Sequence, residues 1–91
     1  MPADIVLPDR LDNSDARSLR ENLLAHRFGS LHIDAQMVQG LGVLNAQVLF
    51  AAATQWRADG QPFLLTASPA LYRDMTNLGL LFPELSQECT Q

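Results

Sequence analysis

Short apolar runs alternate with helix-patterned segments along this chain, and this alternation restricts the possible folds more than any other feature. Residues 5–7, 31–33 and 62–66 are short runs rich in Val, Ile, Leu and Phe, which is typical of strands. In the segments between them, apolar residues recur with the helical period. The order strand-helix-strand-helix-strand-helix predicts an α/β domain, βαβαβα, with a mostly parallel sheet packed with helices.

Capping residues and glycines mark the ends of the predicted helices. The first helix begins near Asn13, with Asp12 or Asn13 as its cap, and Gly29 is expected to end it in the left-handed conformation. The second helix covers roughly residues 43–58 and ends at a Gly-containing turn. The third helix begins at residues 68–69, because serine is a good cap and proline is accepted at the first helical position.

The chain length and composition predict a single folded domain. Ninety-one residues, 1–91, fit one domain, with a core from about residue 5 to residue 82. Residues 83–91 are predicted to be a polar C-terminal tail. The hydrophobic content of 47% against 18% charged residues excludes the class of intrinsically disordered chains.

Charge and cysteine usage restrict the partners and the compartment. The net charge is −4, and the six basic residues, all arginine, are scattered singly, so nucleic acids and anionic membrane surfaces are not expected as partners. No apolar stretch approaches the ~20 residues that a membrane span needs, and the acidic N-terminus is unlike a signal peptide. The single cysteine, Cys89, fits a reducing compartment. We therefore expect a cytoplasmic protein that does not insert directly into a membrane.

No constellation of residues predicts catalysis. His26, His32 and Cys89 lack the spacing of a metal site, and no serine lies in a nucleophile elbow. The aspartates flank strands and helices, where capping of backbone amides accounts for them. The sequence therefore predicts neither an enzyme nor a bound cofactor or metal.

A glycine-containing segment precedes the central helix. Residues 40–45 (GLGVLN) begin like a dinucleotide fingerprint, but Asn45 replaces the third glycine and the segment does not follow a strand directly, which argues against nucleotide binding. What remains is a turn with three apolar side chains, those of Leu41, Val43 and Leu44. Inward packing is the simplest expectation, above all for Leu44. The alternative is that part of this turn stays exposed as a docking surface.

Several motifs occur in an order that is similar to a known module. Residues 7–12 (LPDRLD) resemble an opening L-x-G-x-L-D motif, and residues 31–34 (LHID) resemble a central strand that ends in aspartate. Residues 38–53, and then Trp56, Gly60, Phe63 and Leu78-Gly79-Leu80, resemble the second helix, the fourth strand and the final helix. Together they resemble the STAS domain, the sulfate-transporter and anti-sigma-factor-antagonist module, from Ile5 to about Phe82.

This resemblance implies a non-catalytic role in partner switching and signal transduction, because stand-alone STAS proteins dock partners through the start of the second helix and the loop before it. The implied partner of an anti-sigma-factor antagonist is an ATP-binding anti-sigma kinase. The implied partner-binding residues lie within the segment 40–47: Gly40, Leu41, Gly42, Val43, Leu44, Asn45 and Gln47.

The chain departs from the STAS pattern at the regulatory position. In the antagonists the kinase phosphorylates a serine or threonine in this segment, and the added charge of about −1.5 to −2 disrupts an apolar interface. No serine or threonine lies between Ser30 and Thr54, and the phosphorylated position falls on Gly42, Val43 or Leu44. We predict that this chain is not switched by phosphorylation there.

Two further expectations follow from the departures. Residues 1–4 leave no room for the extra N-terminal strand of most STAS domains, so residues 5–7 should lie near a sheet edge, where a homodimer could form by strand pairing. The missing phosphorylation site also favours an alternative function. In that alternative the chain is a structural STAS subunit of a larger assembly, as in a phospholipid ABC transporter or a chemotaxis system.

Overall fold

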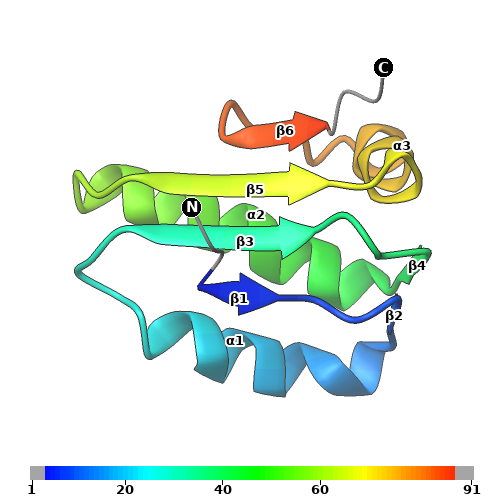
Figure 1. Ribbon diagram of the computed structural model, residues 1–91, viewed down its shortest axis with the longest axis horizontal. Coiled ribbons are helices and arrows are strands. Elements are labelled where there is room, and N and C mark those ends of the chain that lie inside the picture. The colour runs from blue at the N-terminus through cyan, green and yellow to red at the C-terminus, as the bar shows by residue number, and fades with distance from the viewer. Residues whose placement is uncertain (1–3, 88–91) are drawn as a thin grey trace.

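The computed structural model describes residues 4–87. Figure 1 shows a sheet in the centre, with α2 behind it, α1 along one side and α3 near the carboxyl ends of the strands. The protein therefore has an α/β fold in which a four-strand parallel sheet packs against three helices. In chain order the elements are β1 (Ile5–Val6), β2 (Arg10–Leu11), the 3-10 helix η1 (Asn13–Asp15), α1 (Ala16–Leu24), β3 (Leu31–Ala35), β4 (Gly40–Leu41), α2 (Val43–Ala58), β5 (Phe63–Ala67), α3 (Pro69–Leu78) and β6 (Leu85–Gln87).

The main sheet has the strand order β1-β3-β5-β6, and every neighbouring pair is parallel. Its register aligns Ile5, Ile33, Leu65 and Leu85 in one row across the strands. The prediction of a mostly parallel sheet is confirmed, and β1 lies at an edge of it, as the sequence pattern predicted. The short strands β2 and β4 form a separate parallel pair.

The strand β6 corrects the prediction that residues 83–91 form a polar tail. Leu85 is buried and pairs with Leu65 of β5, and Arg57 binds both carboxylate oxygens of Glu84 at 2.7 and 3.0 Å. The sequence signal was missing because Leu85 is the one apolar residue of this strand, and polar residues follow it. Residues 88–91, including Cys89, lie outside the described residues.

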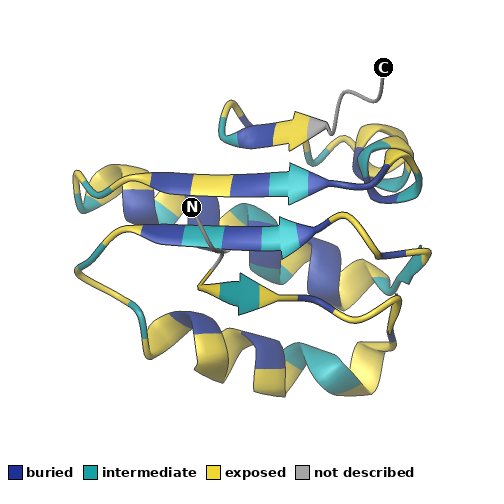
Figure 2. Cartoon of the chain, in the orientation of Figure 1, coloured by how far each residue is buried: buried dark blue, intermediate teal, exposed yellow. Residues whose placement is uncertain are grey.

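One face of the main sheet carries the core. Leu31, Ile33 and Leu65 are buried against α1 and α2, where Trp56 is also buried. Because side chains alternate along a strand, the residues between them point to the opposite face. This second face is partly exposed (Figure 2), and α1 and α2 do not lie over it. On the strands β1, β3 and β5 it presents Val6, His32, Asp34, Leu64 and Thr66.

A residue with left-handed backbone angles follows each of the three α-helices, and two of these residues are glycines. Gly60 and Gly79 take left-handed backbone angles after α2 and α3, with φ of 71° and 72°. After α1 the left-handed residue is Phe28, with φ of 71°, and not Gly29 as predicted. Gly29 already lies on the approach to β3, where its carbonyl accepts a hydrogen bond from the indole N–H of Trp56 at 2.8 Å.

Candidate functional site

The predicted partner-binding residues lie together at one end of the molecule. We call residues 40–47 the docking segment; it consists of β4, Gly42 and the first turn of α2. The segment follows β3 after a short turn, so it lies beyond the carboxyl ends of the parallel strands (Figure 1), close to the start of α3. In open α/β sheets this is the end at which binding sites are commonly built.

The docking segment exposes apolar side chains. Val43 is 46% exposed and Leu44 is 48% exposed, although both belong to the first turn of a helix. Leu41 is half-buried and packs against the core. The expectation that Leu44 packs inward is therefore wrong. Its position on α2 turns it away from the sheet, toward α1.

Asn45 differs from its neighbours in the docking segment because it is fully buried. Its side-chain amide donates a hydrogen bond of 2.6 Å to the carbonyl of Asp12, just before η1. Asn45 therefore cannot form part of an exposed surface, which corrects its prediction as a partner-binding residue. It acts as a positioning residue that ties the start of α2 to η1. Gln47 is exposed and remains available for contact.

The start of α2 is capped from another element. Gly42 has no side chain with which to cap, and the side-chain oxygen of Asn13 accepts a hydrogen bond from the amide of Leu44 at 3.2 Å. Of the two residues predicted as caps of the first helix, Asp12 stands at the N-cap of η1, whereas Asn13 caps α2. The cap of η1 is made by Asp12 and Asp15, whose carboxylate accepts a bond of 2.8 Å from the Asp12 amide.

Gly42 is required by this arrangement. A Cβ atom built at Gly42 would lie closer than any van der Waals contact to the side-chain oxygen of Asn13. The amide of Gly42 also donates a hydrogen bond to the carbonyl of Leu11 at 2.9 Å. The glycine in the sequence is therefore explained by close approach of η1, and no phosphate-binding role is needed to account for it.

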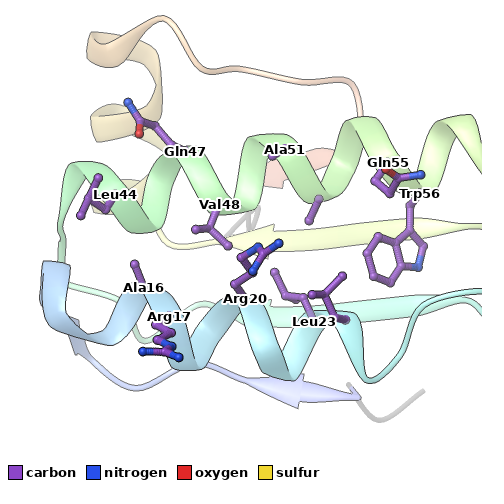
Figure 3. A pocket seen from close by; sticks show the side chains of 12 residues that line it. Ala16, Arg17, Arg20, Leu23, Leu44, Gln47, Val48, Ala51, Gln55 and Trp56 are labelled. Carbon is purple, nitrogen blue, oxygen red and sulfur yellow. The ribbon is translucent and has the colours of Figure 1, made fainter.

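A groove between α1 and α2 continues from the docking segment. Its volume is about 660 Å³, and Leu44 and Gln47 of the docking segment line one end of it. Figure 3 shows side chains from α1 facing those from α2 across this groove. One feature of the sequence indicates such a groove: apolar residues occur all around α2, more than one sheet-facing stripe needs. The remaining lining residues are Ala16, Arg17, Arg20, Leu23, Leu24, Val48, Ala51, Ala52, Gln55 and Trp56.

The polar residues of β3 lie elsewhere. His32 and Asp34 are on the open face of the sheet, and neither lines the groove. The His32 ring approaches the hydroxyl of Thr66 at 3.4 Å, while Asp34 accepts a bond from the amide of Gln36. Within residues 4–87 no group of three or more His, Cys, Asp or Glu side chains is placed to hold a metal.

Two ion pairs shift the pKa values of their side chains, and both lie away from the docking segment. The guanidinium of Arg57 hydrogen-bonds to Glu84, which lowers the pKa of that carboxyl and raises the pKa of Arg57. Arg27 donates to Asp59 at 3.2 Å and lowers the pKa of Asp59. These pairs hold β6 and the end of α1 against the end of α2, so their role is structural.

No protein-family model matches the chain, and no curated protein is significantly similar to it. None of the described helices has the length and apolar character needed to cross a lipid bilayer. The functional assignment therefore depends on the geometry of the docking segment and the groove.

Proposed function

We propose that this protein is a non-catalytic, STAS-like regulatory module that binds a partner protein through the docking segment. The observation that carries the proposal is the exposure of Val43 and Leu44 on a rigidly held helix start. Gly42, Asn13 and Asn45 fix the backbone there by close approach and hydrogen bonds. Preorganised apolar groups lose little conformational freedom on association, so they favour binding.

The resemblance to anti-sigma-factor antagonists supports an ATP-binding anti-sigma kinase as the partner. The fold is compatible with that resemblance, since a parallel sheet and a central helix follow one another as in the module. The docking segment contains no hydroxyl side chain. A kinase of this type would therefore bind the segment but leave it unmodified, and incubation with the kinase and ATP should add no phosphate to residues 40–47.

The alternative function, a structural subunit of a transporter or chemotaxis assembly, is supported by that same lack of a phosphorylatable residue. A permanent subunit needs an exposed docking surface but no switch. Mass-spectrometric identification of the bound protein separates the two: an ATP-binding kinase supports the first function, and a membrane complex or a receptor array supports the second.

The surface is tested by charge insertion. Val43→Asp places a carboxylate in the first turn of α2, where the helix dipole favours it, so the free energy of unfolding should fall by less than about 0.5 kcal/mol. Leu81→Asp is the matched control, because Leu81 is 44% exposed on a different segment. Affinity capture should lose the partner with Val43→Asp and retain it with Leu81→Asp. Equal capture by both variants would show that the partner binds another surface.

A further inference from the structure

The groove between α1 and α2 combines an apolar floor with a positive rim. Leu23, Ala52 and Trp56 form buried parts of the lining. Among residues 4–87, the only ionisable side chains that line the groove are those of Arg17 and Arg20. This local positive charge stands out on a chain whose net charge is −4. The charge that complements this groove is negative.

The two arginines are available to a partner. Arg17 faces Glu21 at 3.6 Å, but its side chain is 90% exposed, so this pair contributes little and is easily replaced. Arg20 makes no ion pair among residues 4–87 and is exposed. Both side chains lie on the α1 side of the groove (Figure 3), so a bound segment would meet positive charge along one flank.

The walls of the groove favour a helix as the occupant. Both walls are helices, which offer side chains but no free backbone groups to an extended peptide, whereas a helical peptide satisfies its own backbone hydrogen bonds. Ala16 and Ala51 are small, so a third helix could approach α1 and α2 closely. The α2 wall runs from Leu44 to Trp56, about 18 Å at the helical rise, which fits a partner helix of roughly three turns.

An acyl chain is a less suitable occupant of the groove than a helix, because apolar side chains at the edge of the groove are also exposed. Leu24 and Leu44 are 43% and 48% exposed at the rim of the groove, and Ala51 is also exposed. A single hydrocarbon chain in the groove would leave these side chains, and much of its own surface, in water. A helix about 10 Å across covers both the floor and the rim.

We infer that the groove between α1 and α2 binds an amphipathic helix of the partner, with apolar residues facing the floor and acidic residues facing Arg17 and Arg20. This inference rests on the proposed function, because Leu44 and Gln47 belong to both the docking segment and the groove. It adds the secondary structure and the charge of the partner segment. The apolar anchors of that helix should recur at helical spacing over about three turns.

Synthetic peptides test this inference without knowledge of the partner. The probe is a helical peptide of about four turns with leucines on one face and glutamates on one flank, and the comparison peptide carries lysines on that flank. The glutamate peptide should bind about fivefold more tightly, the ratio expected from two exposed ion pairs, and the preference should shrink in high salt. Amide chemical shifts should change at α1 and α2 around the groove.

Matched variants locate the binding. Arg20→Gln should reduce the preference for the glutamate peptide from about fivefold to about twofold. Arg73→Gln, an exposed arginine on α3, should leave the preference unchanged. Ala51→Glu should block both peptides, whereas Thr54→Glu, at an exposed position of the same helix, should not. Equal binding of both peptides, shifts outside the groove, or binding of laurate in place of either peptide would overturn the inference.

Capture of the natural partner separates failure of this inference from failure of the proposed function. If Val43→Asp loses the partner and Ala51→Glu retains it, the docking segment stands and the groove inference is wrong. If Ala51→Glu loses the partner and Val43→Asp retains it, the proposed docking segment is wrong. Loss with both variants, and with neither Leu81→Asp nor Thr54→Glu, supports both.

Discussion

The helices α2 and α3 both begin beyond the carboxyl ends of the parallel strands, but their first turns are built in opposite ways. Ser68 starts α3 and is almost fully buried; its hydroxyl accepts from the amide of Leu71 at 3.1 Å and donates to the carbonyl of Val38 at 2.5 Å. The first turn of α2 has no cap of its own and exposes Val43 and Leu44. The start of α3 closes the core, whereas the start of α2 leaves two apolar side chains exposed.

The difference shows which helix caps can be predicted from residues that are neighbours in the sequence. Ser68 and Pro69 lie next to the amides that they affect, so the start of α3 was predicted correctly. The cap of α2 comes from Asn13, 31 residues earlier in the chain, and no local pattern announces it.

Removal of the buried cap of α3 should have the largest effect on stability. Ser68→Ala removes the cap and leaves the carbonyl of Val38 without its hydrogen bond in the core. We expect the free energy of unfolding to fall by about 2–3 kcal/mol, measured by urea denaturation. A loss no larger than that of an exposed cap, about 1 kcal/mol, would show that the buried bond to Val38 contributes nothing.

A methyl group at Gly42 should disturb the start of α2. Gly42→Ala forces the side chain of Asn13 away from the amide of Leu44, and overpacking of this kind costs about 2 kcal/mol. Gly40→Ala is the control, because its Cβ would meet only the Arg10 side chain at 4.0 Å, and the change should stay within about 0.5 kcal/mol. Equal stability of the two variants would contradict the close approach of η1 to α2.

The cap supplied by Asn13 should be worth less than that of Ser68, because it is exposed. Asn13→Ala should lower the free energy of unfolding by about 1 kcal/mol. Hydrogen exchange should accelerate at the amide of Leu44 and remain unchanged at the amide of Leu71. Asn22→Ala, an exposed position of α1, serves as the control. Faster exchange in α1 with no change at Leu44 would show that Asn13 caps the first helix and not α2.

The ion pair between Arg57 and Glu84, just before β6, should produce the smallest effect, and this effect should be lost at acid pH. The pKa of Glu84 is lowered in the folded protein by Arg57, so its stabilising contribution is present above the unfolded pKa and is lost as pH falls through the folded value. Glu84→Gln should lower stability by less than about 1 kcal/mol at pH 7. That difference should begin to shrink as pH falls to the ordinary glutamate pKa, about 4.3, and should disappear below the lowered pKa of Glu84 in the folded protein. Denaturation of both proteins at several pH values measures it, and a difference that persists at the acid end would exclude this ion pair as its cause.

The sequence predicted the elements of the fold well where one residue pattern controls one element. The alternation of strands and helices, the bounds of α2 and the start of α3 follow from apolar periodicity and local capping. β6 was missed because Leu85 is its only apolar residue, and its pairing with β5 depends on a chain return that no local pattern encodes. The left-handed conformation of Phe28 was missed because the neighbouring Gly29 can adopt a positive φ at a lower steric cost than phenylalanine.

The candidate site was predictable only in part for a related reason. The exposure of Val43 could be expected from the sequence, because Val43 lies in an apolar turn at the start of a helix. Burial of Asn45 depends on the carbonyl of Asp12, and exposure of Leu44 depends on the space between α1 and α2. Distances between elements cannot be predicted from the spacing of residues along the chain. The groove and the place of its two arginines could therefore be recognised only in the structure.

Site-specific photo-crosslinking tests the central claim most directly. A photoreactive amino acid is placed at Leu44 in one protein and at Leu81 in another, and each is irradiated in cells that contain the natural partner. Adducts to a second protein should form from position 44 and not from position 81, whose exposure is similar. Adducts from position 81 with none from position 44 would contradict the assignment of the docking segment.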